Sequence, residues 1–249
     1  VRFNLIELGP GDGAKTKIIL KHLIKSNAKF TYTPIDISKT AIAELRSSLK
    51  SEFPVLKINP IIGDYLNGLA RFKKTGAKNL ILFLGANIGN FNKKETLNFL
   101  KRLGKTASGG DLVLIGFDLK KSPRILQKAY DDPRGITKKF NLNLLKRINR
   151  ELGGNFIIRN FYHHEFYNPV SGTMESYLLS RKIQTIHIKQ IKSKFKFQEW
   201  EPIHTEYSFK YSLKDIARLA GHTGFKVIRN FLDKKGYFAD SLWKIKKPH

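Results

Sequence analysis

The chain has 249 residues, 41% of them hydrophobic and 12% aromatic, which suits one large domain or a domain with a substantial insertion and excludes a disordered chain. It contains no cysteine, which excludes disulfides, thiolate metal sites and cysteine nucleophiles, and it has no apolar run of about 18 residues that would span a membrane. Its 46 Lys and Arg residues against 20 Asp and Glu give a net charge of +26, which keeps nucleic acid and other anionic surfaces open as partners.

Strand and helix signals alternate through the first half of the chain. Apolar runs typical of buried strands lie at 4–8, 31–37, 58–62, 80–84 and 112–117. Amphipathic helical patterns separate several of them, at 15–25, 40–53 and 93–103. Continuous apolar strands separated by helices predict a parallel sheet that is covered on both faces. Right-handed crossovers then make the predicted fold a doubly wound α/β sheet.

The pattern changes after Leu119. Helical signals at 123–130 and 137–152 are followed by β-rich segments, at 155–167, 174–181, 184–191 and 195–200. The βα pattern then resumes with a helix at 213–220, for which Ser212 and Asp215 form a capping box and Gly221 a stop signal, and with strands at 226–231 and 241–246. We therefore predict an inserted α+β domain, 120–210, within an α/β domain made of 1–119 and 211–249.

Glycines after the first predicted strand indicate a cofactor site. Gly9 and Gly11 let the backbone turn sharply and approach a ligand closely. With Ala14 they also satisfy the relaxed dinucleotide fingerprint, so an NAD(P) oxidoreductase is an alternative. Acidic residues next to the glycines and after later strands favour S-adenosylmethionine (SAM) in a class I methyltransferase fold. These residues are Glu7, Asp36 and Asp64.

Each of the later acidic residues has a specific predicted contact. Asp36 ends the second strand, where a carboxylate can accept both ribose hydroxyls. Asp64 follows the third strand, where it can meet the adenine amino group while Tyr65 stacks on the ring. Structural alternatives remain for both: Asp36 as the N-cap of the helix near Ser38, and Asp64 as a turn residue.

Further stretches of the chain resemble one family, the SAM-dependent histidine Nα-methyltransferases of the ergothioneine pathway. The similarity covers nearly the whole chain. Its most specific stretches are Phe83-Leu84-Gly85-Ala86-Asn87-Ile88-Gly89-Asn90, Ala129-Tyr130-Asp131-Asp132, Gly135-Ile136-Thr137, Phe140-Asn141-Leu142-Asn143, 147–152 and Thr205-Glu206-Tyr207-Ser208 with Lys210.

The resemblance implies a role for each matching position. It implies that Asn90 and Tyr130 grip the α-amino-acid head of the substrate and that Glu206 and Ser208 hold its imidazole. Asn and Tyr donate to a carboxylate, Glu accepts an imidazole N–H, and Ser pairs with the other nitrogen. Such a polar site rejects ring analogues that lack those groups. The cofactor-binding residues are then Gly9, Gly11, Lys15, Asp36, Asp64 and Tyr65.

The resemblance also implies a reaction, in which the neutral α-amine attacks the sulfonium methyl in line. The methyl group is already activated, so the protein mainly positions the two reactants, and we assign no catalytic residue. Up to three transfers give a betaine. One departure affects specificity, because Ser176 stands where the family has a Met beside the substrate ring, which predicts a roomier or more polar pocket.

Several alternatives and absences complete the prediction. The family's N-terminal helical segment has no counterpart before Val1, so a truncated, non-catalytic cofactor-binding module is an alternative. The net charge suggests an RNA methyltransferase, but no Pro-Pro-aromatic motif follows the fourth strand and the basic residues lie along the whole chain. His163-His164-Glu165 alternate in direction along a strand, so we expect no metal. We expect a cytoplasmic monomer with a small amino-acid substrate and no membrane partner.

Overall fold

The structure is a computed structural model that describes residues 2–72 and 77–246. Two compact units divide the chain. The first unit combines Val1–Leu119 with Tyr211–His249, and the second unit is the continuous segment Lys120–Lys210.

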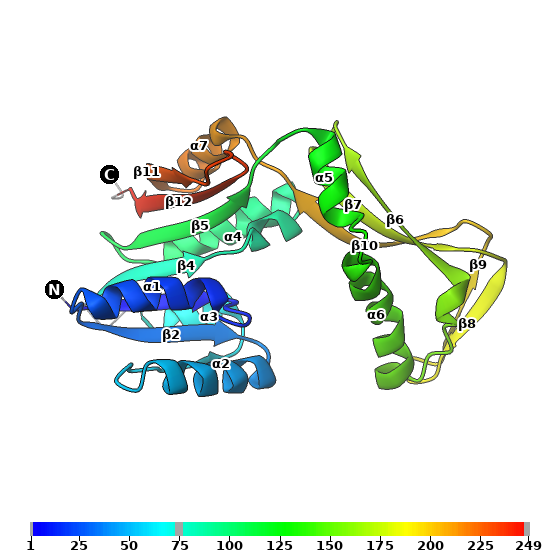
Figure 1. The fold of residues 1–249 in the computed structure, drawn as a ribbon, viewed down its shortest axis with the longest axis horizontal. Helices are drawn as coiled ribbons and strands as arrows, with labels where there is room; N and C mark the ends of the chain where they lie inside the picture. The colour runs from blue at the N-terminus through cyan, green and yellow to red at the C-terminus, as the bar shows by residue number, and fades with distance from the viewer. Residues whose placement is uncertain (1, 73–76, 247–249) are drawn as a thin grey trace. The chain divides into compact units, whose positions relative to one another are not determined.

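A seven-stranded sheet forms the centre of the first unit, in the order β11-β12-β5-β4-β1-β2-β3 (Figure 1). The strands from β1 to β5 pair in parallel, whereas β12 runs antiparallel to both β5 and β11. The predicted doubly wound α/β fold is therefore confirmed. The strands are β1 (Phe3–Leu8), β2 (Phe30–Asp36), β3 (Ile61–Ile62), β4 (Lys78–Phe83), β5 (Leu112–Asp118), β11 (Phe225–Leu232) and β12 (Phe238–Ile245).

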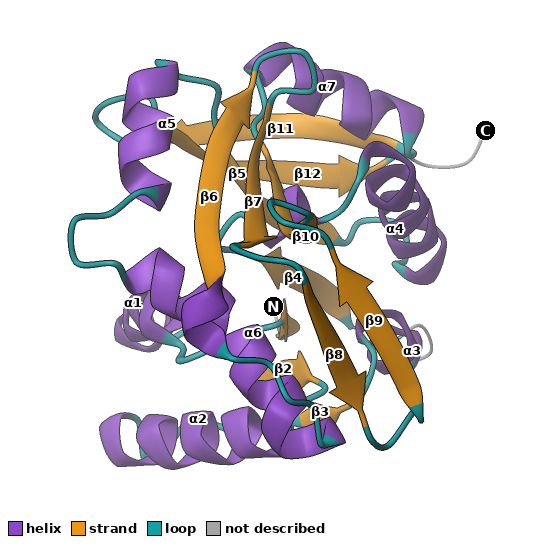
Figure 2. Ribbon diagram, turned by 90° about the vertical axis from the view of Figure 1, so that its right-hand side faces the viewer, coloured by secondary structure: helices purple, strands orange, loops and turns teal. Residues whose placement is uncertain are grey.

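Helices cover both faces of this sheet. In Figure 2, α1 lies on one side of the strands, and α3 and α4 lie on the other. Leu5 of β1 packs with Leu20, Leu45 and Leu49 in one fully buried cluster. Each such side chain contributes about 1.5–3 kcal/mol to folding. The helices are α1 (Ala14–Lys25), α2 (Lys39–Glu52), α3 (Tyr65–Ala70), α4 (Lys93–Thr106) and α7 (Leu213–His222), with a 3-10 turn η1 (Asn87–Asn90) after β4.

The second unit is a small α+β structure. Its three-stranded antiparallel sheet has the order β10-β7-β6, and a two-stranded ribbon pairs β8 with β9. Leu145 of α6, Phe161 of β6 and Leu178 of β7 share one buried core. The elements are α5 (Pro123–Tyr130), α6 (Ile136–Leu152), η2 (Ile158–Asn160), β6 (Phe161–Asn168), β7 (Thr173–Ser180), β8 (Gln184–Ile188), β9 (Ser193–Phe197) and β10 (Pro202–Phe209).

Three segments differ from the sequence prediction. The third strand contains only two residues, because Pro60 has no backbone N–H to donate and Ile58 makes only an isolated bridge to Tyr32. The strand expected from 155 begins at Phe161, after the turn η2. The predicted capping box at Ser212 is confirmed, but α7 continues through Gly221 to His222. The residue with the positive φ that ends such a helix is Gly224, at +86°.

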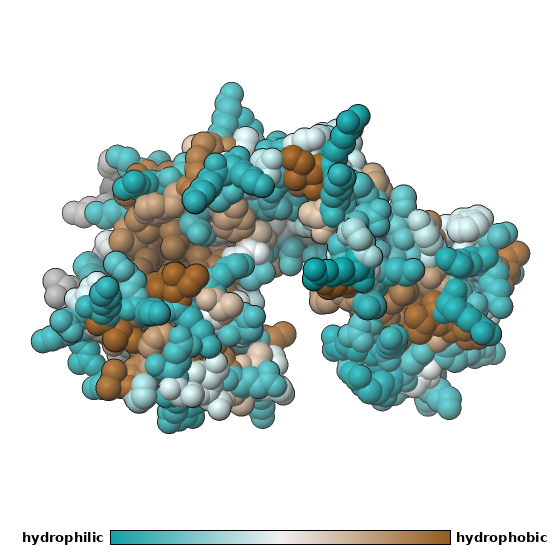
Figure 3. Space-filling model, viewed as in Figure 1, coloured by the Kyte–Doolittle hydropathy of each residue, from teal (hydrophilic) through white to brown (hydrophobic). Residues whose placement is uncertain are grey.

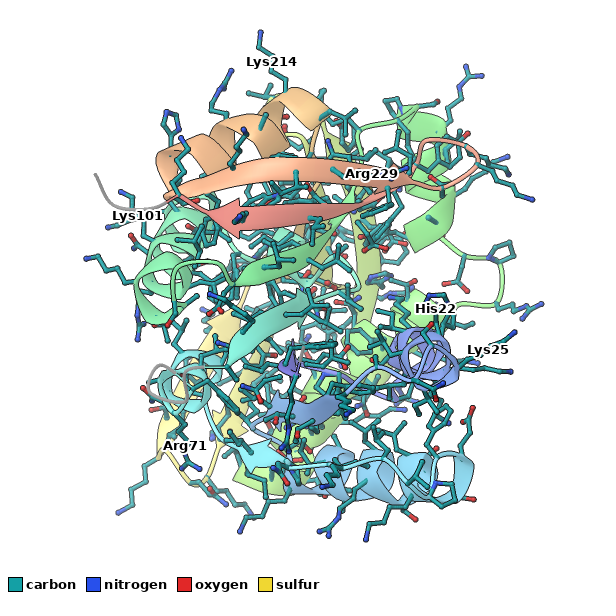
Figure 4. The ribbon with its side chains drawn as sticks, turned by 90° about the vertical axis from the view of Figure 1, so that its left-hand side faces the viewer. His22, Lys25, Arg71, Lys101, Lys214 and Arg229 are labelled. Carbon is teal, nitrogen blue, oxygen red and sulfur yellow. The ribbon has the colours of Figure 1, made fainter. Side chains whose placement is uncertain are left out.

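The positive charge is spread over many elements. Figure 4 labels six exposed basic side chains of the first unit, which come from four different helices and strands and from the turn after α3. Hydrophilic residues also cover much of both units on the face drawn in Figure 3. Within the described residues, no helix is long and apolar enough to cross a bilayer. The labelled residues are His22, Lys25, Arg71, Lys101, Lys214 and Arg229.

Candidate functional site

The loop between β1 and α1 holds three glycines in left-handed conformations. The φ angles are +65° at Gly9, +58° at Gly11 and +72° at Gly13. Most residues with a Cβ avoid this region, so the turn favours glycine. At Gly9 the requirement is also steric, because an added Cβ would lie 2.5 Å from Oη of Tyr65. The loop therefore carries its backbone close against Tyr65 at the carboxyl end of β1.

The side chain of Tyr65 lies close to predicted cofactor residues at the carboxyl ends of β1, β2 and β3. Burial raises the pKa of its phenol, and the nearby carboxylates of Asp36 and Asp64 raise it further. The Asp36 carbonyl accepts the N–H of Gly63 at 2.9 Å, which fixes the end of β2 beside β3. Of the predicted cofactor residues, Gly9, Asp36, Asp64 and Tyr65 thus lie together at the carboxyl ends of β1, β2 and β3.

Both aspartates also stabilise local structure. Oδ1 of Asp64 accepts the N–H groups of Leu66 and Asn67 at 3.0 and 3.1 Å, so Asp64 is the N-cap of α3. Oδ1 of Asp36 accepts the N–H of Ser38 at 2.9 Å, but Ser38 itself is the N-cap of α2. The alternative that Asp36 caps this helix is therefore wrong.

Glu7 of β1 connects this strand to α1 and β2 through hydrogen bonds. Its side chain is buried, and it accepts hydrogen bonds from Thr16 of α1 at 2.6 Å and from Tyr32 of β2 at 2.5 Å. Burial raises the pKa of the Glu7 carboxyl, and these two hydrogen bonds oppose that effect. The acidic residue before the glycines thus ties β1 to α1 and β2.

Lys15, the remaining predicted cofactor residue, lies near the loop that follows β4. A Cβ added to Gly85 would lie 3.0 Å from Nζ of Lys15. The loop carries Asn87, whose Nδ2 lies 3.7 Å from the position of an added Cβ at Gly9. Asp240 of β12 is a nearby carboxylate that the sequence pattern did not indicate. Burial raises the pKa of Asp240, and the charge of Lys15 lowers it.

In the second unit, polar residues of three strands share one face of the sheet. Glu206 of β10 pairs with Ser176 of β7, and Ser176 pairs with Glu165 of β6. Directly opposite residues on antiparallel strands project to the same side. Ser208 lies farther along β10 on this face, opposite Met174. Ser176 therefore lies between two carboxyl groups.

The structure brings two of the predicted substrate residues into contact. The hydroxyl of Tyr130, at the end of α5, donates to Oγ of Ser208 at 2.7 Å. Glu206 lies two residues before Ser208, and burial raises the pKa of its carboxyl while the charge of Lys210 lowers it. Asn90 belongs to the first unit, where it is exposed at the end of η1.

Lys210 is a functional candidate that the predicted site did not include. Only 3% of its surface is exposed. Its Nζ donates to Ser208 Oγ at 2.8 Å and to Tyr130 Oη at 2.9 Å, and it lies 4.9 Å from the centre of the Tyr130 ring. Alternation along a strand was the available signal, because Glu206, Ser208 and Lys210 are spaced by two residues and so point to one side.

His163 and Glu165 form a buried pair on the same side of β6. Nδ1 of His163 lies 2.7 Å from Oε2 of Glu165, and both side chains are about 95% buried, with 4% and 5% exposed. Burial, and then the carboxylates of Asp131 and Asp132, raise the pKa of Glu165 to about 7. Burial lowers the pKa of His163. No group of three or more His, Asp or Glu side chains among the described residues is arranged to hold a metal ion.

This pair predicts a pH-dependent stability. The pKa of Glu165 is about 7 in the folded protein against an ordinary value of 4.5. The folded state therefore keeps a proton that the unfolded state loses, and the stability from this group falls as the pH rises from about 4.5 to about 7. In Glu165→Gln there is no proton to lose. We expect the melting temperature of this variant to rise relative to that of the wild type as the pH rises from about 5 to about 7.5.

Thermal unfolding of both proteins across this pH range provides the measurement. His163 has the opposite effect, since its lowered pKa removes stability as the pH falls. Comparing variant and wild type at each pH cancels most of that contribution. Glu199→Gln is the matched control, because Glu199 is an exposed carboxylate of the same unit. A difference that stays constant with pH for Glu165→Gln would contradict the assignment.

Comparisons with known proteins agree with this arrangement. A family model described as histidine-specific methyltransferase, SAM-dependent, matches residues 2–245. Relatives named histidine N-alpha-methyltransferase, from Mycobacterium tuberculosis and Mycolicibacterium smegmatis, are 31% and 29% identical over 238 residues, which are 96% of this chain and 74% of each relative. A solved SAM-dependent methyltransferase from Clostridium acetobutylicum matches with a TM-score of 0.53 at 11% identity, over 99% of this chain and 85% of that chain, and this likeness concerns the fold alone.

The family assignment confirms the predicted enzyme class and cofactor, and it excludes the NAD(P) oxidoreductase alternative. The left-handed glycine loop against Tyr65 and the two carboxylates beside it lie at the carboxyl ends of parallel strands, where ligands bind in open α/β sheets. The chain therefore belongs to the family of histidine-specific, SAM-dependent methyltransferases.

Proposed function

We propose that this enzyme transfers methyl groups from SAM to the α-amino group of histidine, up to three times, to give a betaine. One observation carries the substrate assignment: Glu206 and Ser208 lie on the same face of β10, and Tyr130 donates a hydrogen bond to Ser208. This face offers a carboxylate and a hydroxyl within two residues, which suits the two nitrogens of an imidazole ring. The named relatives act on histidine, as their names state.

The first unit is proposed to hold the cofactor. The backbone of Gly9 and Gly11 approaches it, and Asp36 accepts its ribose hydroxyls. Asp64 and Tyr65 bind the adenine, and Lys15 pairs with the carboxylate of the methionine part. The narrow space above Gly9, which a Cβ would fill, fits a ligand carried close to the backbone. SAM supplies a methyl group that is already activated on a sulfonium. These residues are proposed to bind and orient it.

The second unit is proposed to recognise the amino acid. The one proton of Tyr130 is donated to Ser208 in the structure, so its oxygen is proposed to accept from the amine N–H of the amino-acid head. By resemblance to the family, Asn90 is a further candidate for binding an amino-acid head group. Glu206 accepts a ring N–H, and Ser208 pairs with the other ring nitrogen. The amine must be neutral to attack, and a nearby sulfonium charge lowers its pKa. No residue is assigned as a general base.

Ser176 is the position that bears most directly on the range of substrates. It lies between Glu206 and Glu165, and the resemblance to the family implies a larger Met at this position. A smaller, polar residue leaves room for a side chain wider than imidazole or for one with an additional polar group. The charge of the enzyme does not favour a nucleic acid, because the basic residues labelled in Figure 4 come from several elements.

Mass spectrometry tests the proposal directly. The protein is incubated with SAM and a pool of the twenty amino acids, and the products are identified by mass. Histidine heavier by one to three methyl groups is the expected result. A methylated product from another amino acid would contradict the histidine assignment while keeping the class, and Ser176 would be the first position to change. If no amino acid is methylated although SAM binds, RNA is the next substrate to test.

A further inference from the structure

The buried ammonium group of Lys210 lies next to Ser208, one of the two side chains proposed to hold the substrate ring. Nζ of Lys210 donates to Ser208 Oγ and to Tyr130 Oη, and Tyr130 Oη donates to Ser208 Oγ. The three distances are between 2.7 and 2.9 Å. An ammonium group only donates, so neither oxygen can donate to it. The ammonium therefore fixes the direction of two of the three hydrogen bonds, and Tyr130 is the donor in the third.

These hydrogen bonds determine what Ser208 offers to a ligand. A hydroxyl oxygen has two acceptor positions and one proton. Ser208 Oγ accepts from both Lys210 and Tyr130, which uses the two acceptor positions. Its own proton is then the group that it presents. Glu206 on the same side of β10 has the opposite polarity, because a carboxylate only accepts. The pocket face therefore pairs one donor with one acceptor.

Lys210 influences Glu206, the hydrogen-bond acceptor, as well as Ser208, the hydrogen-bond donor. Burial raises the pKa of the Glu206 carboxyl, and the positive charge of Lys210 lowers it, so the ammonium favours the ionised form. The same face carries a second carboxyl, Glu165, across Ser176. Without the ammonium, Ser208 gains an acceptor position and Glu206 is more easily protonated into a donor. After both changes, Ser208 is no longer only a donor and Glu206 is no longer only an acceptor toward the ligand.

We infer that Lys210 is a positioning residue that determines ring specificity, because it holds Ser208 as a donor beside the accepting Glu206. A neutral imidazole matches this pair, since it has one N–H and one acceptor nitrogen. Rings that lack either group leave a buried partner unsatisfied. The inference rests on the proposed function, because it requires that the substrate ring occupies this face.

Lys210→Met tests the inference, since it keeps the length of the side chain and removes the charge and the donors. We compare kcat/KM for histidine with that for pyrrol-2-yl-alanine and pyrrol-3-yl-alanine, in which a ring N–H remains and carbon replaces the acceptor nitrogen. The wild type is expected to prefer histidine at least about 100-fold. Lys210→Met is expected to reduce this preference about tenfold or more, mainly through the KM of histidine.

Two further variants separate positioning from folding. Lys214→Met removes the same charge from an exposed site on α7 and is expected to keep the wild-type preference. Ser208→Ala removes the donor alone and is combined with Lys210→Met in a double-mutant cycle. If Lys210 acts through Ser208, Lys210→Met costs less in the Ser208→Ala background than in the wild type. Should Lys210→Met fail to fold, Ser208→Ala alone carries the test through the histidine-to-pyrrole ratio.

The possible failures are distinguishable. An unchanged histidine-to-pyrrole ratio in folded Lys210→Met, or in Ser208→Ala, overturns the inference and leaves the proposed function intact when the wild type methylates histidine. Effects that multiply independently in the double-mutant cycle also overturn it. A wild type that binds SAM and methylates no histidine contradicts the proposed function, and the inference falls with it.

Discussion

Glu206→Ala is expected to lower kcat/KM for histidine by about 100-fold or more, with most of the loss in KM. The Glu206 carboxylate is partly buried, and in the proposed complex its removal leaves the ring N–H of histidine without an acceptor. Truncating one partner of a buried, charged hydrogen bond costs about 2–5 kcal/mol. Steady-state kinetics with varied histidine at saturating SAM measure the effect.

The same variant is expected to bind SAM with wild-type affinity. Glu206 belongs to the second unit, whereas the predicted cofactor residues belong to the first. Glu199→Ala is the matched control, because it removes an exposed carboxylate from the same unit and is expected to retain wild-type kinetics. Equal KM values for histidine in Glu206→Ala and Glu199→Ala would exclude Glu206 from the ring site.

Gly9→Ala is expected to lower SAM affinity by about 100-fold or more, and activity at limiting SAM with it. The left-handed φ of +65° costs any residue with a Cβ about 1–2 kcal/mol. The new Cβ would also lie 2.5 Å from Oη of Tyr65, so the loop or Tyr65 must move. Either movement disturbs the space beside Asp36 and Asp64. Calorimetric titration with SAM gives the affinity, and thermal unfolding gives the stability.

Gly236→Ala separates backbone strain from the collision with Tyr65. Gly236 has the same φ of +65°, and an added Cβ there meets no atom within 4 Å. It lies in the turn between β11 and β12, outside the cofactor loop. We expect a similar strain cost but wild-type SAM affinity in Gly236→Ala. Equal SAM affinities in the two variants would show that the approach of Tyr65 to Gly9 does not shape the cofactor site.

The sequence predicted the central sheet well, because its strands are continuous apolar runs that only a sheet covered on both faces buries. The structure has parallel strands at each of those runs. By contrast, the bounds of β10 were not predicted, although this strand carries Glu206 and Ser208. Its register shifts between His204 and Glu206, so an extra residue interrupts the two-residue period that identifies a strand.

The candidate site could be predicted from the sequence only at residues, such as the loop glycines, whose type and position have few other structural explanations. Glycines between a strand and a helix indicated the cofactor loop directly. Lys210 was missed because a lysine in a sequence with 46 Lys and Arg is usually solvated, and its burial depends on Tyr130, which is 80 residues away along the chain. The raised pKa of Glu165 depends likewise on burial against α5, which the local pattern of β6 does not contain.

The antiparallel strand β12 has a consequence for how the chain folds during synthesis. Residues 238–244 pair with 112–118, so the sheet of the first unit closes only after the whole of Lys120–Lys210 has been translated. The second unit is continuous in sequence, and its sheet forms from neighbouring segments, so it can fold while the last strands are still in the ribosome. Pairings between distant segments are slow to form. Until β12 arrives, β5 remains an unpaired hydrophobic edge, which makes the nascent first unit dependent on chaperones or on rapid completion of the chain.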